Sequence, residues 1–146
     1  MRLLIALGYM LAVALPAAAH EYLNFDEVTA AFGMDLENTE IRTENLAPGL
    51  YNLRGAGGNI VASIGDQGVL LVDSQFPQMI PRIKNAVSDL GGDGIDFTIN
   101  THWHFDHSDG NPMLGRDGTW MVSHENSRQD LHALEIKKLK QPPKTL

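Results

Sequence analysis

The spacing of hydrophobic residues changes along the chain, and these changes divide it into predicted strands and helices. Three short stretches are rich in β-branched and aliphatic residues, which is typical of strands: Gly49–Arg54, Asn59–Ile64 and Val69–Val72. The turn-forming residues Gly65-Asp66-Gln67-Gly68 join the second stretch to the third. The sequence therefore predicts a strand followed by a β-hairpin.

A helical period follows the hairpin. Between Gln78 and Leu90, hydrophobic side chains recur every three or four residues, which predicts an amphipathic helix that ends at Gly91-Gly92. Ile95–Asn100 then alternates hydrophobic and polar residues and predicts a strand, with Phe97 and Ile99 on its hydrophobic side.

The remaining pattern predicts a strand at Trp120–Ser123 and a helix at Glu125–Lys140. Strands that alternate with helices indicate an α/β fold with a layered sheet. Before the first strand, residues 20–48 are polar and weakly patterned, and they predict one short helix at Phe25–Phe32 followed by a loop.

The first nineteen residues have the three regions of a secretory signal peptide. Met1-Arg2 is positively charged, Leu3–Leu15 is hydrophobic, and Ala17-Ala18-Ala19 offers a small-residue cleavage pattern. A membrane anchor is the alternative, but the hydrophobic run is shorter than the roughly 20 residues that span a bilayer. We therefore expect a periplasmic or secreted protein that has no stable membrane association after cleavage.

Composition narrows the classes of function. The chain has 146 residues and a formal net charge of −7, so a surface that binds nucleic acid is disfavoured. It contains no cysteine, which excludes disulfides and thiolate metal ligands. Any metal site must use histidine and carboxylate side chains, and we expect a small molecule as the substrate. Nothing in the composition decides the oligomeric state.

Four residues with metal-ligand chemistry fall within six positions, in the order His102, His104, Asp106 and His107. Two histidines separated by one residue in an extended segment point to the same side. A turn after them would let Asp106 and His107 face the same cavity, and imidazole and carboxylate both bind Zn²⁺. The spacing predicts a metal site, and four ligands in one segment favour a pair of metals.

The stretch N-T-H-W-H-F-D-H-S-D-G-N, from Asn100 to Asn111, resembles the signature loop of the metallo-β-lactamase superfamily of zinc hydrolases. The resemblance covers about Gly49–Gln141. It implies an αββα sandwich with the loop at the edge between two sheets, of which this chain resembles the N-terminal half. The predicted organisation is a signal peptide at 1–19, an N-terminal segment at 20–48 and the N-terminal part of the domain at 49–146.

The resemblance also implies roles for individual residues. His102 and His104 would bind a first Zn²⁺, and Asp106 and His107 a second, while Asp106 would also act in catalysis by orienting the attacking water. Asp73 resembles the carboxylate that supports this loop, although a simple polar residue at a strand end is the alternative. The second set of ligands expected in the family has no counterpart in this chain.

The implied activity is zinc-dependent hydrolysis, in which a metal-bound hydroxide attacks an ester, thioester, lactone or amide-type substrate. Two alternatives remain open at this stage: a non-catalytic fragment that binds metal through half a site, and a metallo-β-lactamase that hydrolyses β-lactams. A complete protein that recruits ligands from a partner chain is a further hypothesis. His124 and His132 follow the loop but are not expected to be ligands.

Overall fold

The computed structural model describes residues 24–140, with side chains described as far as residue 133. The predicted signal peptide at 1–19 lies outside the described residues. Six strands form one sheet in the order β1-β2-β3-β4-β5-β6. The strands are β1 (Arg42–Ala47), β2 (Leu50–Arg54), β3 (Ile60–Gly65), β4 (Gly68–Val72), β5 (Phe97–Asn100) and β6 (Trp120–Ser123).

The sheet is antiparallel in its first part and parallel in its second. Strands β1 to β4 pair antiparallel, and the predicted hairpin joins β3 to β4 with Gly65 paired to Gly68. Strands β5 and β6 continue in parallel, each after a helical crossover. The helices are α1 (Phe25–Ala31), the 3₁₀ turn η1 (Pro77–Met79), α2 (Ile80–Asp89), α3 (Phe105–Ser108), α4 (Asn111–Arg116) and α5 (Glu125–Lys140).

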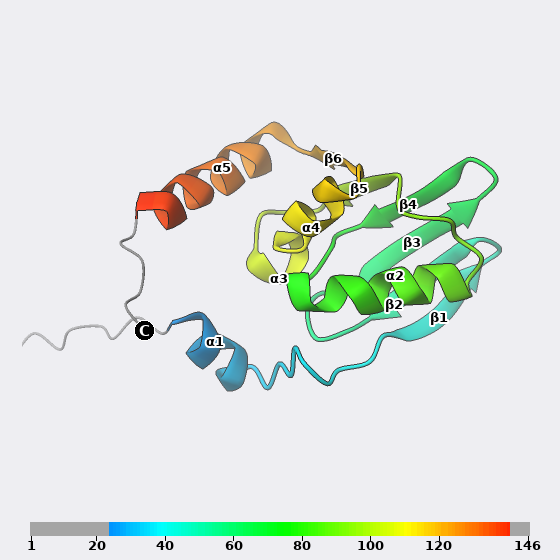
Figure 1. Cartoon of the computed structure of the whole chain (residues 1–146), viewed down its shortest axis with the longest axis horizontal. Coiled ribbons are helices and arrows are strands. Elements are labelled where there is room, and N and C mark those ends of the chain that lie inside the picture. The colour runs from blue at the N-terminus through cyan, green and yellow to red at the C-terminus, as the bar shows by residue number, and fades with distance from the viewer. Residues whose placement is uncertain (1–23, 141–146) are drawn as a thin grey trace, which may run out of the picture.

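Helix α2 lies across one face of the sheet (Figure 1). Its buried residues Ile83 and Val87 belong to a single hydrophobic core that also contains Leu53, Ile60 and Leu71 from the sheet. The predicted helical period therefore places the expected stripe of α2 in the core. The prediction of a helix at Glu125–Lys140 is also confirmed, because α5 has the same bounds.

Strand β1 corrects the expectation of a loop before Gly49. It pairs antiparallel with β2, although five of its six residues are exposed. An edge strand with solvent on its surface has little hydrophobic alternation, so the sequence carried no strand signal there. The preceding segment is also attached to the fold, because the Arg82 guanidinium on α2 donates to the carbonyls of Leu36 and Glu37.

Strand β5 has two different faces, as its alternating sequence predicted. Thr98 and Asn100 point to the helix-covered side and are buried, whereas Phe97 and Ile99 lie on the other face and are 44% and 37% exposed. The predicted strand and its alternation are therefore confirmed, and its hydrophobic residues lie on the face that α2 does not cover. Alternation alone predicted two faces but not which of them the helices cover.

The uncovered face of the sheet is hydrophobic where β5 and β6 run side by side. Phe97 pairs with Leu70 and Trp120, and Ile99 pairs with Val72 and Val122, so these side chains share one face. Trp120 and Val122 are 72% and 47% exposed. The described residues thus form one sheet with helices on one side, which corresponds to half of the expected αββα arrangement.

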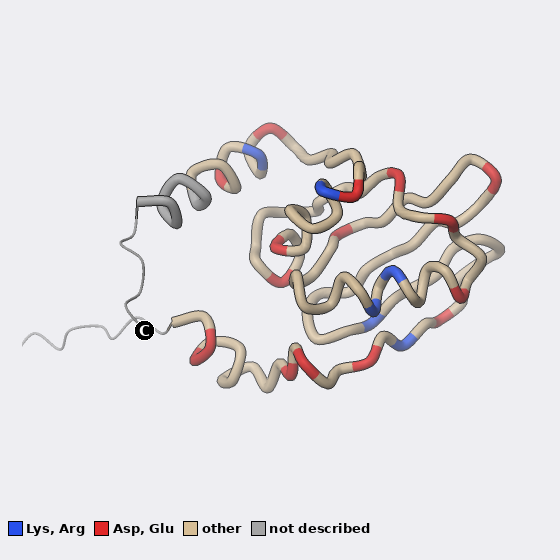
Figure 2. Tube along the Cα trace, in the orientation of Figure 1, with Lys and Arg blue, Asp and Glu red and all other residues tan. Residues whose placement is uncertain are grey.

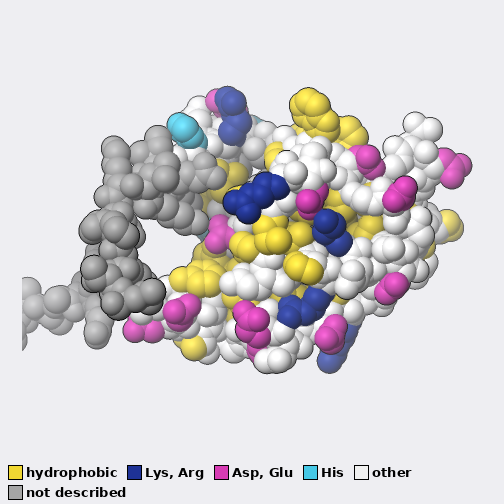
Figure 3. Space-filling view, viewed as in Figure 1, with side chains coloured by type: hydrophobic (Ala, Val, Ile, Leu, Met, Phe, Trp, Pro, Cys, Tyr) yellow, Lys and Arg dark blue, Asp and Glu magenta, His cyan; other side chains and the backbone are white. Residues whose placement is uncertain are grey.

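The helix-covered face, shown in Figure 3, has basic side chains over α2 and α4 and hydrophobic side chains between them. A groove of about 370 Å³ lies there, and its lining includes Ile80, Lys84, Met113 and Arg116. Among the described residues, no helix is both long enough and hydrophobic enough to cross a bilayer.

Candidate metal centre

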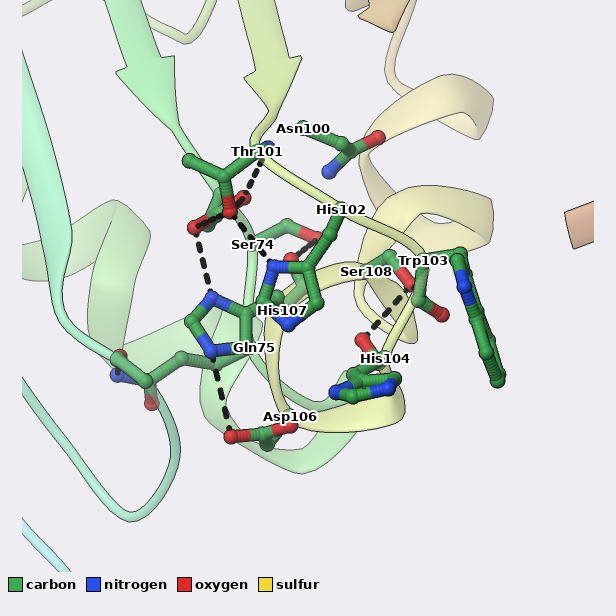
Figure 4. A network of polar contacts seen from close by, with 12 residues as sticks. Ser74, Gln75, Asn100, Thr101, His102, Trp103, His104, Asp106, His107 and Ser108 are labelled. Carbon is green, nitrogen blue, oxygen red and sulfur yellow. Dashed lines mark hydrogen bonds and ion pairs between the residues drawn. The ribbon is translucent and has the colours of Figure 1, made fainter. Parts of the chain in front are cut away.

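The four predicted ligands leave the sheet at the carboxyl end of β5. Thr101 to His104 form a connecting segment, and the one-turn helix α3 then carries Asp106 and His107 (Figure 4). His104 occupies the N-cap position of α3 in an extended conformation, with φ −64° and ψ 147°. The histidine pair therefore precedes a helical turn, as the sequence predicted, although it lies in a connection and not in the strand itself.

The structure brings these four side chains together. The ring centroid of His102 lies 4.6 Å from that of His104 and 4.2 Å from that of His107. The His107 Nε2 atom lies 3.4 Å from Oδ2 of Asp106. Three imidazoles and one carboxylate are thus gathered over α3, on the side of the segment that faces the end of β4 (Figure 4).

Asp73 at the end of β4 holds this segment in place. Its carboxylate is buried and accepts hydrogen bonds from the backbone N–H of Thr101 at 2.8 Å and from Nδ1 of His107 at 2.7 Å. The hydroxyl of Thr101 also donates to Asp73 Oδ2, at 2.8 Å. Because a carboxylate only accepts, Nδ1 of His107 is the nitrogen that donates to Asp73, and in the neutral ring Nε2 then keeps its lone pair for a ligand.

This orientation is the one that a metal-binding histidine needs. Metal-bound imidazoles commonly donate their second ring nitrogen to a carboxylate, which fixes the ring and its tautomer. The role expected for Asp73 from the family resemblance is therefore matched by its contacts. Asp73 has φ +71°, in the left-handed region that residues other than glycine rarely adopt. Such conformations occur most often at functional sites.

The donor set fits Zn²⁺, which binds imidazole nitrogen and carboxylate oxygen readily. His102, His104, Asp106 and His107 are the residues that would hold it. Although they are neighbours, within the described part of the chain no three His, Asp or Glu side chains are arranged as a group that could hold an ion. The residues therefore supply the ligand chemistry, and their assignment to a metal stays a prediction.

Several polar residues that the sequence analysis did not identify fix the base of the segment. Ser108 donates from its hydroxyl to the carbonyls of Trp103 and His104, at 3.1 and 3.0 Å. The side-chain amides of Asn100 and Asn111 donate to each other, at 3.2 and 2.7 Å. Asn100 and Asn111 are the first and last residues of the signature stretch, so their paired amides close it into a loop.

The aromatic residues of the segment have different surroundings. Phe105 packs against Phe25 of α1 and Phe76, with ring centroids 5.9 and 6.0 Å apart, so packing is its role in this structure. Trp103 is 37% exposed and meets the ring of His104 edge to face at 4.7 Å. It borders the histidine cluster on its solvent side.

The two later histidines lie elsewhere. His124 follows β6, is exposed, and accepts a hydrogen bond at Nδ1 from the backbone N–H of Asn126 at 3.2 Å. His132 is exposed on α5. Neither residue takes part in the contacts of the histidine cluster that are described above.

Comparison with known proteins agrees with this fold and loop. The family model of the metallo-beta-lactamase superfamily matches residues 54–139, which is more than half of the chain. The chain therefore belongs to the metallo-β-lactamase superfamily. The predicted recognition and the α/β fold class are both confirmed by this match and by the structural neighbours.

The solved structures that resemble the chain include subclass B3 metallo-β-lactamases. The enzyme BJP-1 of Bradyrhizobium japonicum has 25% identity and a TM-score of 0.58, and the match covers 66% of this chain and 38% of that one. A B3 enzyme with an active-site glutamic acid has 30% identity and a TM-score of 0.55, over 60% of this chain and 34% of its own.

A curated relative of another activity also matches. The coenzyme F420H(2) oxidase of Methanothermobacter marburgensis is 32% identical over 62 residues, which are 40% of this chain and 15% of that protein. The chain thus spans well under half the length of each of these relatives. These relatives support membership of the superfamily but do not identify the reaction of this chain.

Proposed function

We propose that the chain carries the metal-binding loop of a zinc-dependent hydrolase that acts on a small ester, thioester, lactone or amide-type substrate. The observation that carries the proposal is the gathering of His102, His104 and His107 beside Asp106, with His107 oriented by Asp73. Membership of a superfamily whose members are mostly metal-dependent hydrolases supports it further.

Each residue has a distinct part in this proposal. His102 and His104 present their rings from the connecting segment, while Asp106 and His107 present theirs from α3. A Zn²⁺ ion bound there would supply a Lewis acid for the substrate and lower the pKa of water towards neutrality. We assign to Asp106 the role of orienting the attacking water and accepting its proton, which its contact with His107 Nε2 supports.

A half-site that binds metal without turnover is the second candidate. It is favoured because, within the described part of the chain, no three ligand-type side chains are arranged as a group that could hold an ion. Within the hydrolase proposal, a β-lactam is the more specific substrate, and the similarity to B3 metallo-β-lactamases supports it.

The proposed partner is a small molecule and not nucleic acid. Acidic residues are spread along the described chain (Figure 2), which agrees with the net charge of −7. The proposed location, periplasmic or secreted, rests on the sequence pattern of residues 1–19.

A substrate panel tests the two candidates. We expect the zinc-loaded chain to hydrolyse at least one of four chromogenic probes, namely an ester, a thioester, a lactone and a β-lactam, and to lose this activity with a chelator. Asp106→Asn should lower the rate by about 100-fold or more, as is usual for loss of a positioned proton acceptor. Zinc binding without turnover would favour the half-site, and turnover that is unaffected by a chelator would contradict the proposal.

A further inference from the structure

Gln75, two residues after Asp73, is a buried amide with an unusual backbone conformation. Its side chain is fully buried, and its φ of +51° lies in the left-handed region that side-chain residues rarely adopt. Both polar ends of the side chain are used. Oε1 accepts from the backbone N–H of Gly57 at 3.3 Å, and Nε2 donates to the carbonyl of Gly58.

The Gln75 side chain therefore ties the connection between β2 and β3 to the end of β4. Its backbone carbonyl makes a third link, because it accepts from the N–H of Gly110 at 2.8 Å, just before α4. One residue thus joins three segments that are distant in sequence. The third segment belongs to the metal-binding region, since Gly110 follows α3 with only Asp109 between them.

The glycines held by Gln75 lie directly against the proposed ligands. The backbone N–H of Gly58 donates to the carbonyl of Asp106 at 3.0 Å. A Cβ atom on Gly58 would lie 2.5 Å from Nε2 and 2.7 Å from Nδ1 of His107, so only glycine leaves room for that ring. Gly58 therefore packs against the His107 ring and holds the backbone of Asp106 through a hydrogen bond.

We propose that Gln75 is a positioning residue of the metal centre, which acts through Gly57 and Gly58 to fix His107 and Asp106. The inference deepens the proposed function and rests on it. The left-handed backbone conformation of the buried Gln75 costs free energy. Its side chain bonds to Gly57 and Gly58 and not to a proposed ligand. Its effect on a metal must therefore pass through the glycines.

Two variants separate the effect of the Gln75 side-chain hydrogen bonds from the effect of its backbone conformation. Gln75→Met keeps a side chain of similar length and removes both hydrogen-bonding groups, whereas Gln75→Gly also relieves the left-handed φ. Thr98→Val is the matched control, because Thr98 is equally buried on β5 and its hydroxyl has no partner among the described residues. Thermal unfolding of each metal-free variant monitors loss of the fold.

Zinc titration and the absorption spectrum of the Co²⁺-loaded chain are the first readouts. We expect both Gln75 variants to lose zinc affinity by about tenfold or more, the usual effect of removing a residue that orients ligands. The Co²⁺ spectrum should change in both variants and stay unchanged in Thr98→Val. Wild-type affinity and spectrum in the Gln75 variants would overturn the inference and leave the proposed function standing.

Amide hydrogen exchange of the metal-free chain is the second readout and needs no ion. Exchange at the Gly58 N–H should become faster by about tenfold in Gln75→Met, because its bond to Asp106 loses its support. Exchange at the Ile64 N–H, which is bonded to Gly49 in the same sheet, should not change. If the unchanged chain does not bind zinc, the proposed function fails. Unchanged exchange at the Gly58 N–H in Gln75→Met would separately overturn the positioning role of Gln75.

Discussion

Asp73 accepts hydrogen bonds from both ends of the metal-binding segment, at Thr101 and at His107. Asp73 directly follows β4, so one buried carboxylate links the end of this strand to the segment. The shape of the segment therefore depends on a residue 28 positions away from Thr101 in the sequence.

Asp73→Asn tests whether this carboxylate sets the tautomer of His107. Asparagine tolerates a left-handed φ and keeps an oxygen for the N–H of Thr101, but its NH₂ group would donate to His107 Nδ1. The proton would then move to Nε2 and block the ligand position. We expect zinc affinity to fall by about 10- to 100-fold with the fold retained, measured by zinc titration and circular dichroism.

Asp96→Asn is the control for Asp73→Asn. Asp96 also accepts a backbone N–H, from Val69 at 2.8 Å, but it lies outside the metal-binding segment. Its substitution should leave zinc affinity unchanged. Equal affinities for Asp73→Asn and the unchanged chain would contradict the role given to Asp73.

Thr98→Val tests the buried hydroxyl on β5. Thr98 is fully buried, and its Oγ1 has no hydrogen-bond partner in the described part of the chain. Valine has a similar shape and removes the unpaired polar atom, so the free energy of unfolding should rise by about 1 kcal/mol. Denaturant unfolding measures the change, and a clear loss of stability would show that the hydroxyl is paired.

At the residue scale, the ligand-type residues were predictable and their supports were not. His102, His104, Asp106 and His107 stand out because they are close together in sequence. Gln75 and Gly58 act through tertiary contacts between segments, and a glycine cluster or a single glutamine gives no such signal by itself. The pairing of Asp73 with His107 was expected only from the family resemblance.

At the scale of elements, helix α1 is attached to the metal-binding segment by aromatic packing. Phe25 meets the rings of Phe76 and Phe105 edge to face, with centroids 6.0 and 5.9 Å apart. Phe105 is the first residue of α3, directly between His104 and Asp106. The N-terminal helix therefore supports the helix that carries two proposed ligands.

Phe25→Ala should weaken this attachment. Because the ring is 40% exposed and makes two aromatic contacts, we expect a loss of about 1–2 kcal/mol in the free energy of unfolding. Denaturant unfolding measures it. Phe32→Ala is the control, because Phe32 at the end of α1 is 72% exposed, and equal effects of the two changes would contradict the packing role of Phe25.

Most elements were predicted, but burial does not separate those found from those missed. Strand β6 was predicted although none of its residues is buried, and α4 was missed although its Leu114 is buried. The hairpin, α2 and the strand positions followed from hydrophobic period and turn residues, because burial imposes that period. Strand β1 was missed because it is an exposed edge. The alternation of β5 was predicted, but alternation alone does not tell which face the helices cover. Only the position of α2 decides which face is the core.

At the scale of the whole molecule, no described element covers the hydrophobic face of β5 and β6. Large exposed hydrophobic surfaces are uncommon on monomeric proteins and bind other surfaces or dyes. We expect the chain to bind the dye ANS in its folded state and to self-associate at high concentration.

Trp120→Lys combined with Val122→Lys should reduce both effects. The two side chains are 72% and 47% exposed, so their replacement costs little core packing. Dye fluorescence and sedimentation velocity measure the change, with Phe32→Lys as a control at an exposed hydrophobic residue outside the sheet. Unchanged dye binding in the double variant would contradict the assignment of the hydrophobic surface to this face.

A calorimetric zinc titration of three forms of the chain shows whether the segment from His102 to His107 binds zinc. The unchanged chain and the control variant His124→Ala with His132→Ala should bind at least one Zn²⁺ with equal affinity. The variant His102→Ala with His104→Ala should bind at least about 100-fold more weakly, because two imidazole ligands are gone. Equal binding by all three forms, or loss only in the His124 and His132 variant, would contradict the account.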